Sequence, residues 1–149
     1  MRAVVQRVKE ASVTVENNIV SEIKQGLLIL LGIEPDDGQK DIEYIVRKCL
    51  NLRIFDDSNG VMNLSALNIS ADILLVSQFT LMGDVRHGNR PSYIAAAPPS
   101  DAEPIYEKVI TEFRASGLTV GCGVFGADMS VSLVNNGPVT ILIDSKKLF

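Results

Sequence analysis

The run GLLILLG, residues 26–32, constrains the fold more than any other stretch of the chain. Its five consecutive apolar residues leave no polar position to face water, and they are too few to cross a bilayer. Such a run, flanked by glycines, is typical of a β-strand that is covered on both faces. The fold must therefore supply helices or further strands on both sides of it.

Two helical patterns supply part of that cover. Between residues 37 and 50, apolar side chains recur at spacings of three and four, as on one face of a helix. They are Ile42, Ile45, Val46, Cys49 and Leu50. A second helix is expected from Ser100, which forms a capping-box pattern with Glu103, to Gly117, with Pro104 still in the first turn.

The remaining patterns predict a large sheet. Alternating or β-branched runs indicate seven or eight strands, which are RAVVQRV, ASVTVEN, IVSEI, GLLILLGI, ILLVSQFT, LTVGCGVFG, ADMSVSLV and PVTILID. With two long helices, they predict one α+β domain over residues 1–149, built on a large, mostly antiparallel sheet or barrel.

Composition excludes several classes of protein. The net charge of −4 argues against a broad positive face, so contact with nucleic acid should be local, and neither DNA nor a membrane is an expected partner. Residues 1–13 lack the apolar core of a secretory signal, which favours a cytoplasmic protein. Cys49 and Cys122 form no CxxC pair and the chain has one histidine, so we expect reduced thiols, no metal and no cofactor.

The polar end of ILLVSQFT is the first candidate site. Ser77, Gln78, Phe79 and Thr80 follow its apolar residues. A hydroxyl becomes a strong nucleophile only when a base activates it, and the one histidine, His87, lies in the following loop. No catalytic triad can be assigned, and on these residues alone a strand end that bonds to its own backbone is favoured.

Two further segments carry candidate binding residues. Arg86 and Arg90 lie in a polar loop before Tyr93, where they could contact phosphate and the ring could stack on a base, although two arginines are common on any surface. Met129 follows the glycine-flanked segment GVFGAD, and a methionine there is more often core than ligand contact.

The pair Gly137-Pro138 is the last candidate. Asn136-Gly137 lies between two strand patterns and predicts a hairpin. Proline at a strand start donates nothing to the ladder, and the bond before it can be cis at small cost. Because Gly137 has no side chain and Pro138 no N–H, the tip would offer carbonyl oxygens, which suit an ammonium group.

Taken in order, these motifs resemble those of the D-aminoacyl-tRNA deacylase family. The resemblance covers nearly the whole chain, in MRAVVQRV, ASVTV, LLVSQFTL, RPSY, AAAPP, FGADM and NNGPVTILIDS. Its most specific part is SQFT followed by GPVT. The chain departs from the family at Met82, Cys122 and Asn136, without losing a motif residue.

The resemblance implies hydrolysis of the ester between a D-amino acid and its tRNA, and of glycyl-tRNA mischarged on tRNA(Ala). It also implies a homodimer with its active sites at the subunit interface. Gly137 and Pro138, joined by a cis bond, would enter the partner's site, hold the substrate's amino group through carbonyl oxygens and exclude an L side chain.

The same resemblance places Ser77, Gln78, Phe79 and Thr80 in the pocket, with Met129 nearby. Thr80 is a nucleophile candidate in this family, but nothing in the sequence visibly activates it. Attack by water, assisted by a ribose hydroxyl of the tRNA, is the more economical mechanism, and both stay open. Contacts with the acceptor end of the tRNA are expected from Arg86 and Arg90, together with Lys146 or Lys147.

Two other functions remain as alternatives. One is a small-molecule acyl-ester hydrolase that uses Thr80 or Ser77. The other is a non-catalytic RNA-binding module that uses the basic loop, which the negative net charge and the scarcity of aromatic residues weaken.

Overall fold

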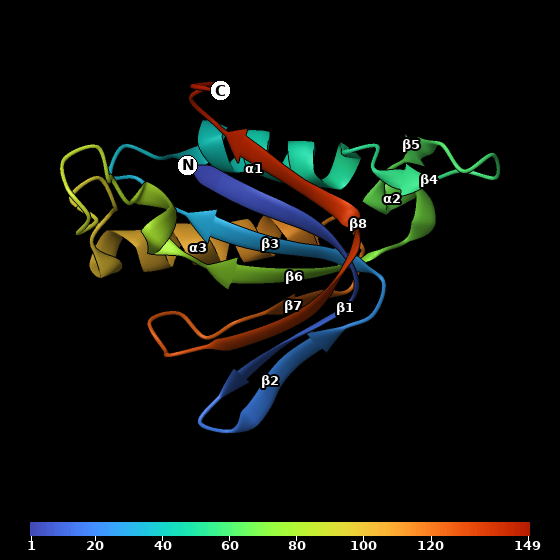
Figure 1. Cartoon of the computed structure of the whole chain (residues 1–149), viewed down its shortest axis with the longest axis horizontal. Coiled ribbons are helices and arrows are strands. Elements are labelled where there is room, and N and C mark those ends of the chain that lie inside the picture. Colours follow the sequence, from blue (N-terminus) through green and yellow to red (C-terminus); the bar gives the residue numbers. More distant parts are fainter.

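The computed structural model describes residues 1–149 as eight strands and three α-helices, with one 3₁₀ turn (Figure 1). The strands are β1 (Arg2–Val15), β2 (Asn18–Ile23), β3 (Gly26–Gly32), β4 (Phe55–Asp56), β5 (Met62–Leu64), β6 (Asp72–Ser77), β7 (Val120–Cys122) and β8 (Ser130–Asp144). The helices are α1 (Gln39–Asn51), α2 (Ala66–Ile69) and α3 (Pro99–Arg114), and the 3₁₀ turn is η1 (Phe79–Met82). The predicted α+β class is confirmed.

Strand β1 organises the six-stranded sheet. On one edge it pairs antiparallel with β3 and then, past Val8, with β2, while β8 pairs along the other edge. The pairs β3–β6 and β6–β7 are parallel, because the helices α1 and α3 lie in the connections between these strands. β2 also contacts β6 and β7, so the sheet curls into a nearly closed form (Figure 1). The sheet is therefore mixed, with its antiparallel part around β1.

The strand β3 is covered on both faces, as GLLILLG predicts. Successive side chains of a strand point to opposite faces. Leu27, Ile29 and Leu31 lie in the main core with α1 and α3, whereas Leu28 lies in a smaller core with β2, β6 and the far half of β1. The curled sheet supplies the second cover, which the sequence required but did not identify.

Helix α1 carries the predicted apolar stripe. All five stripe residues are buried, and they are Ile42, Ile45, Val46, Cys49 and Leu50. The helix begins at Gln39, two residues after the predicted start at Asp37. The buried carboxylate of Asp37 instead accepts the N–H of Glu34 at 2.7 Å and fixes the turn before the helix.

Helix α3 corrects the predicted cap. It begins at Pro99, and no side chain caps it, so the prediction of Ser100 as N-cap is wrong. Proline is favoured at the first helical position because its missing N–H would have no partner there. Pro104 consequently lies in the second turn rather than the first. The helix ends at Arg114, and Gly117, with φ of +82°, donates to the Arg114 carbonyl just beyond it.

Strand β8 corrects the predicted hairpin. Ser130–Asp144 is one strand that pairs with β1 along both halves, rather than two strands joined at Asn136-Gly137. A bulge absorbs the turn-forming residues, since residues 136–139 of β8 lie opposite the single residue Arg7 of β1. Turn preference is a local effect, and the long ladder with β1 outweighs it.

The two cysteines are free, as predicted. Cys49 is buried in α1, and this burial raises the pKa of its thiol to about 12. Cys122 is half-buried in β7. None of the helices combines the length and the apolar character that a membrane span requires.

Candidate active site

The carboxyl end of β6 presents the first candidate residues. Ser77 ends the strand opposite Leu31 of β3, and Gln78 donates its N–H to the Leu31 carbonyl at 2.7 Å. The chain then leaves the sheet in η1, which holds Phe79 and Thr80 at the surface. The carboxyl ends of parallel strands are the usual place for ligands in open α/β sheets. The parallel pair β3–β6 thus creates such an edge here.

A cavity of about 490 Å³ lies beside this edge. Its walls include the ends of β3 and β6, the start of α3 and the turn after β7, and most of them are apolar. Its lining includes Ser77, Gln78, Phe79, Tyr93, Phe125 and Gly126. This volume is in the range of small-ligand sites. Three of the four predicted SQFT residues line it, and Thr80 lies outside the lining.

Three aromatic rings line the cavity. Phe79 and Tyr93 meet edge to face, with ring centroids 5.2 Å apart. The third, Phe125, packs on Tyr106 with centroids 5.7 Å apart. The Tyr106 hydroxyl donates to the Leu75 carbonyl at 2.8 Å, and burial raises its pKa well above the ordinary value. Tyr106 therefore fixes the Phe125 wall, a role that sequence reasoning missed.

The two hydroxyls of the motif have no activating base. The Thr80 hydroxyl accepts a hydrogen bond from the side-chain amide of Gln78. Neither Ser77 nor Thr80 hydrogen-bonds to a histidine, a carboxylate or an amine, and His87 is exposed in the loop beyond η1. A neutral amide donor cannot remove a proton. The geometry therefore supports a positioning role for Thr80 better than a nucleophilic one.

The basic loop after η1 is folded onto itself. Backbone bonds between Asp84 and Ser92 close it in both directions, at 2.8 and 2.9 Å. The Arg86 side chain turns back and pairs with the Asp84 carboxylate at 2.6 Å. Hydrogen bonds from Arg86 lower the pKa of Asp84 to about 2. Neither Arg86 nor Arg90 lines the cavity, and the charge of Arg86 is already compensated.

The Gly137-Pro138 pair lies in the bulge of β8, exposed to solvent, with a cis peptide bond between its two residues. It faces Arg7 of β1, whereas Ser77 is aligned with Ala3 of β1 through Leu31 of β3. The two motifs are four residues apart along β1, at about 3.3 Å each, and three strand spacings apart across the sheet, at about 4.8 Å each. These two offsets are perpendicular and combine to a separation of roughly 20 Å. One chain alone does not bring them together.

The buried residue Arg7 holds this bulge. Its guanidinium donates to the Asn136 carbonyl at 2.8 Å and to the Ile54 carbonyl at 2.5 Å, and it pairs with Asp56 at 3.3 Å. The Asn135 amide donates in turn to the Arg7 carbonyl. The only sequence signal was the place of Arg7 in a strand where alternate residues face the core.

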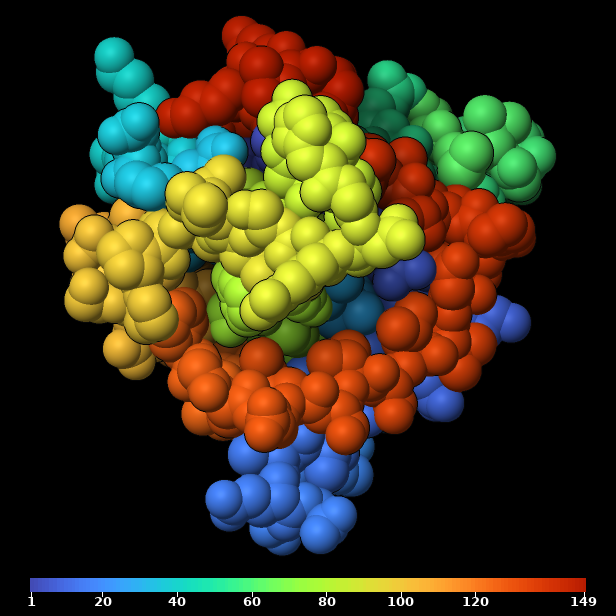
Figure 2. All heavy atoms as spheres, turned by 60° about the vertical axis from the view of Figure 1, so that its left-hand side comes forward, coloured from blue at the N-terminus to red at the C-terminus, as the bar shows by residue number.

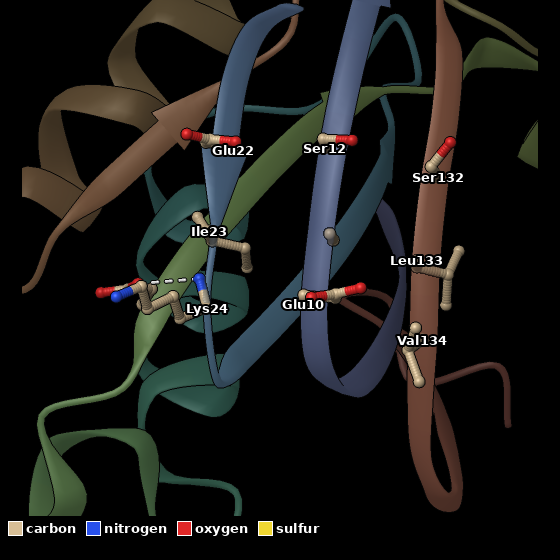
Figure 3. Close-up of a pocket in the computed structure, with 10 residues that line it drawn as sticks. Glu10, Ser12, Glu22, Ile23, Lys24, Ser132, Leu133 and Val134 are labelled. Atoms are coloured by element: carbon tan, nitrogen blue, oxygen red, sulfur yellow. Dashed lines mark hydrogen bonds between the residues drawn. The ribbon is translucent and has the colours of Figure 1, made fainter.

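Met129 and a second surface hollow do not belong to the cavity. Met129 packs on the smaller core, where Gly123 leaves room for its sulfur, and it does not line the cavity. A hollow of about 620 Å³ opens on β1, β2 and β8, where the Lys24 N–H donates to the Asp72 carboxylate at 3.1 Å (Figure 3). This hollow contains no predicted site residue and no aromatic ring, so the SQFT cavity is the stronger candidate.

Comparison with known proteins identifies the family of the chain that contains this cavity. Residues 4–144 match the model of a protein family described as D-Tyr-tRNA(Tyr) deacylase. The chain belongs to this family. The matched segment contains both the SQFT cavity and the 136–139 bulge, so the resemblance stated from the sequence is confirmed.

Relatives in the deacylase family align along their whole length. A D-aminoacyl-tRNA deacylase of Thermosipho africanus is 56% identical over 149 residues, covering 100% of both chains. One of Porphyromonas gingivalis is 59% identical over 146 residues, covering 97% of both. A solved structure titled c-Myc DNA Unwinding Element Binding Protein superposes with a TM-score of 0.91 at 44% identity, over 97% of this chain and 98% of that one.

A more distant structure shares the fold alone. It is titled as a probable eukaryotic D-amino acid tRNA deacylase and superposes with a TM-score of 0.80 at 17% identity. It covers 95% of this chain and 97% of its own. The mixed, nearly closed sheet with its two long helices is therefore a fold that this chain shares with that structure.

Proposed function

We propose that this chain hydrolyses the ester that joins a D-amino acid to its tRNA, and that it acts in the cytoplasm, where charged tRNA is used. The observation that carries the proposal is the cavity at the SQFT edge, within a chain that matches the deacylase family from residue 4 to residue 144. Its aromatic walls suit the terminal adenine of a tRNA and an apolar amino-acid side chain. Curated relatives that align over the full chain carry the name D-aminoacyl-tRNA deacylase.

The complete site is formed by two copies of the chain. The Gly137-Pro138 bulge lies roughly 20 Å from the cavity of its own chain, by the strand spacings given above. An open strip of the sheet runs between them, in which Val4 of β1 pairs with Leu142 of β8, and Leu142 is 60% exposed. A second copy related by a two-fold axis would cover this strip and place each bulge in the other's cavity. The strip and the exposed bulge both support this homodimer.

The bulge distinguishes D from L substrates. Its carbonyl oxygens accept hydrogen bonds from the substrate's ammonium group, and with the amino group fixed, the hydrogen and the side chain on the α-carbon have defined directions. A D side chain points to the open cavity, while an L side chain points into the bulge. Glycine has no side chain to exclude, so glycyl-tRNA mischarged on tRNA(Ala) is a further substrate.

Water is the attacking group, and a ribose hydroxyl of the tRNA assists it. Gln78 directs one amide N–H to Thr80, and its second N–H is available to the ester oxygen that gains charge as water adds. The ribose hydroxyl accepts a proton from the attacking water while it passes its own proton to the oxygen that leaves, so that the ester bond breaks into acid and alcohol. Phe79 and Ser77 line the cavity around this step, whereas Met129 packs on the smaller core outside that lining.

Deacylation of matched D- and L-aminoacyl-tRNA tests the proposal. The wild type should hydrolyse the D form and spare the L form, and Pro138→Ala should relax that preference. Pro35→Ala, in the exposed turn before α1, is the matched control and should keep it. Activity on free D-amino-acid esters but not on charged tRNA would instead favour a small-molecule esterase that uses Thr80 or Ser77.

Two measurements address the mechanism and the assembly. If water attacks, Thr80→Ala should keep part of the turnover, and no acyl-enzyme should accumulate on the wild type after rapid quenching. An acyl group trapped on Thr80 would overturn this mechanism. In solution the chain should sediment as a dimer, and Leu142→Glu, which places a charge on the open strip, should shift it to the monomer and abolish activity.

A further inference from the structure

Three cations converge on one aromatic ring away from the cavity. The Tyr44 ring on α1 has the Arg47 guanidinium carbon at 5.8 Å from its centroid, the Lys48 ammonium at 5.6 Å and the Lys147 ammonium at 5.8 Å. Tyr44 itself is half-buried on the main core, and the three cations are exposed. We call this set the Tyr44 cluster. It joins residues about one hundred positions apart in the sequence, so local sequence did not reveal it.

The charges of the Tyr44 cluster are not compensated. Arg47, Lys48 and Lys147 form no ion pair with any carboxylate of the chain. Glu43, the acidic residue beside Tyr44, instead accepts a hydrogen bond from Gln39. Cation–π contacts at exposed sites contribute only about 0.5–1 kcal/mol each, so the ring gathers the cations without neutralising them. In a chain with net charge −4, this is a local positive surface.

Two of the other basic candidates, Arg86 and Lys146, are already neutralised, whereas Arg90 forms no ion pair. Arg86 pairs with Asp84 at 2.6 Å, and Lys146 pairs with Asp41 at 2.9 Å and with Asp37 at 3.3 Å. An arginine or lysine that already holds a carboxylate gains less from a phosphate, because the existing pair must first be broken. The structure therefore shifts the expected phosphate contact from Arg86 to the Tyr44 cluster.

A short chain of contacts connects the cluster to the cavity edge. Arg2 donates to the Leu81 carbonyl in η1 at 3.2 Å and to the Asp144 carboxylate at 3.1 Å. Asp144 in turn accepts the N–H of Lys146, the neighbour of Lys147, at 2.7 Å. In Figure 2 the C-terminal segment, in red, lies above the yellow-green loop that follows η1, on the same side of the molecule. A rod-shaped ligand that ends in the cavity can therefore pass over the cluster.

We propose that the Tyr44 cluster binds phosphates of the acceptor stem while the 3′ end of the same tRNA occupies the cavity. This inference rests on the proposed function. Each cation lies within 6 Å of the same ring centroid, so the cluster is at most about 12 Å wide. Each strand of a duplex carries a phosphate roughly every 3.4 Å along the helix axis. The three cations can therefore contact about two or three phosphates of one strand. These contacts carry no base information, so they suit an enzyme that accepts many tRNAs.

The test compares two triple variants of equal charge. The first is Arg47→Gln, Lys48→Gln and Lys147→Gln. The matched control replaces three exposed cations elsewhere, as Lys24→Gln, Lys108→Gln and Arg114→Gln. Both are assayed on D-aminoacyl-tRNA over a range of salt concentrations, and on D-aminoacyl-adenosine, which carries the ester without a stem.

In the cluster variant, KM for D-aminoacyl-tRNA should rise about tenfold at moderate salt, and the slope of log KM against log salt should fall by about 2 to 3, with kcat unchanged. KM for D-aminoacyl-adenosine should stay at the wild-type value, and the control variant should keep most of the wild-type slope. An unchanged slope in the cluster variant, or an equal loss in the control, would overturn the inference. A wild type that hydrolyses neither compound would instead refute the proposed function.

Discussion

Replacing Arg7 by methionine tests whether the hydrogen bonds of Arg7 hold the 136–139 bulge in place. The methionine keeps most of the buried volume but removes the donors to the Asn136 and Ile54 carbonyls. Each buried group left without a partner costs about 1–3 kcal/mol, so the expected loss of unfolding free energy is about 3–5 kcal/mol. The pair with Asp56 adds little, because that carboxylate is 51% exposed.

Thermal unfolding at a fixed protein concentration measures this loss, since a dimer's melting temperature depends on concentration. For a chain of this size each kcal/mol lowers Tm by roughly 2–4 °C, so Arg7→Met should melt roughly 10 °C below the wild type. Arg53→Met is the matched control, because Arg53 also donates to a backbone carbonyl, of Asn63, but does so at the surface. It should change Tm by no more than about 4 °C.

Because the bulge is proposed to select the D substrate, Arg7→Met should also change the stereochemical preference of the reaction. Measured at a temperature where Arg7→Met is folded, the ratio of D to L deacylation should fall, because the carbonyls of Gly137 and Pro138 are no longer held in place. A variant that loses less than about 1 kcal/mol, or that is destabilised as expected yet keeps the full D preference, would refute the assignment of Arg7 as the anchor.

Two further predictions concern the sheet and the loop. Gly26→Ala should cost at least about 2 kcal/mol in urea unfolding, because its Cβ would overlap the Asp72 carbonyl across the β3–β6 ladder. Gly38→Ser, with open space around it, should stay within about 1 kcal/mol of the wild type, and an equal loss in both would contradict the packing argument. By NMR, the Asp84 carboxyl should titrate near pH 2, and in Arg86→Gln its pKa should return toward 3.8. The contribution of the Asp84–Arg86 pair to the free energy of unfolding is therefore complete above pH 3.8 and is lost as the pH falls toward 2.

Local patterns predicted the elements whose signals are contained within one segment. The run GLLILLG identified a strand buried on both faces, and the stripe from Ile42 to Leu50 identified α1, because solvent exposure repeats with the period of the element. Boundaries were less accurate. Ser100 has good capping chemistry, but α3 begins earlier, at Pro99, whose fixed φ suits the first helical position equally well.

Local patterns failed where a long-range contact decides the outcome. Asn136-Gly137 has the composition of a hairpin turn. β8 nevertheless continues, because β1 pairs with it on both sides of the bulge, and these hydrogen bonds together outweigh the turn preference of two residues. The burial of Arg7 likewise depends on the carbonyls of Ile54 and Asn136, which lie 47 and 129 residues away in the sequence.

The sequence by itself determined the α+β class, the family and the SQFT and Gly-Pro motifs, because these are properties of residue order. Only the tertiary structure decided that the first three residues of SQFT meet Tyr93 and Phe125 around one cavity, and that Gly137-Pro138 lies in a bulge on the far side of β1. It also decided that Arg86 is paired while Arg47, Lys48 and Lys147 are not. Distance and charge compensation depend on how the sheet curls and where α1 packs, and no local pattern encodes either.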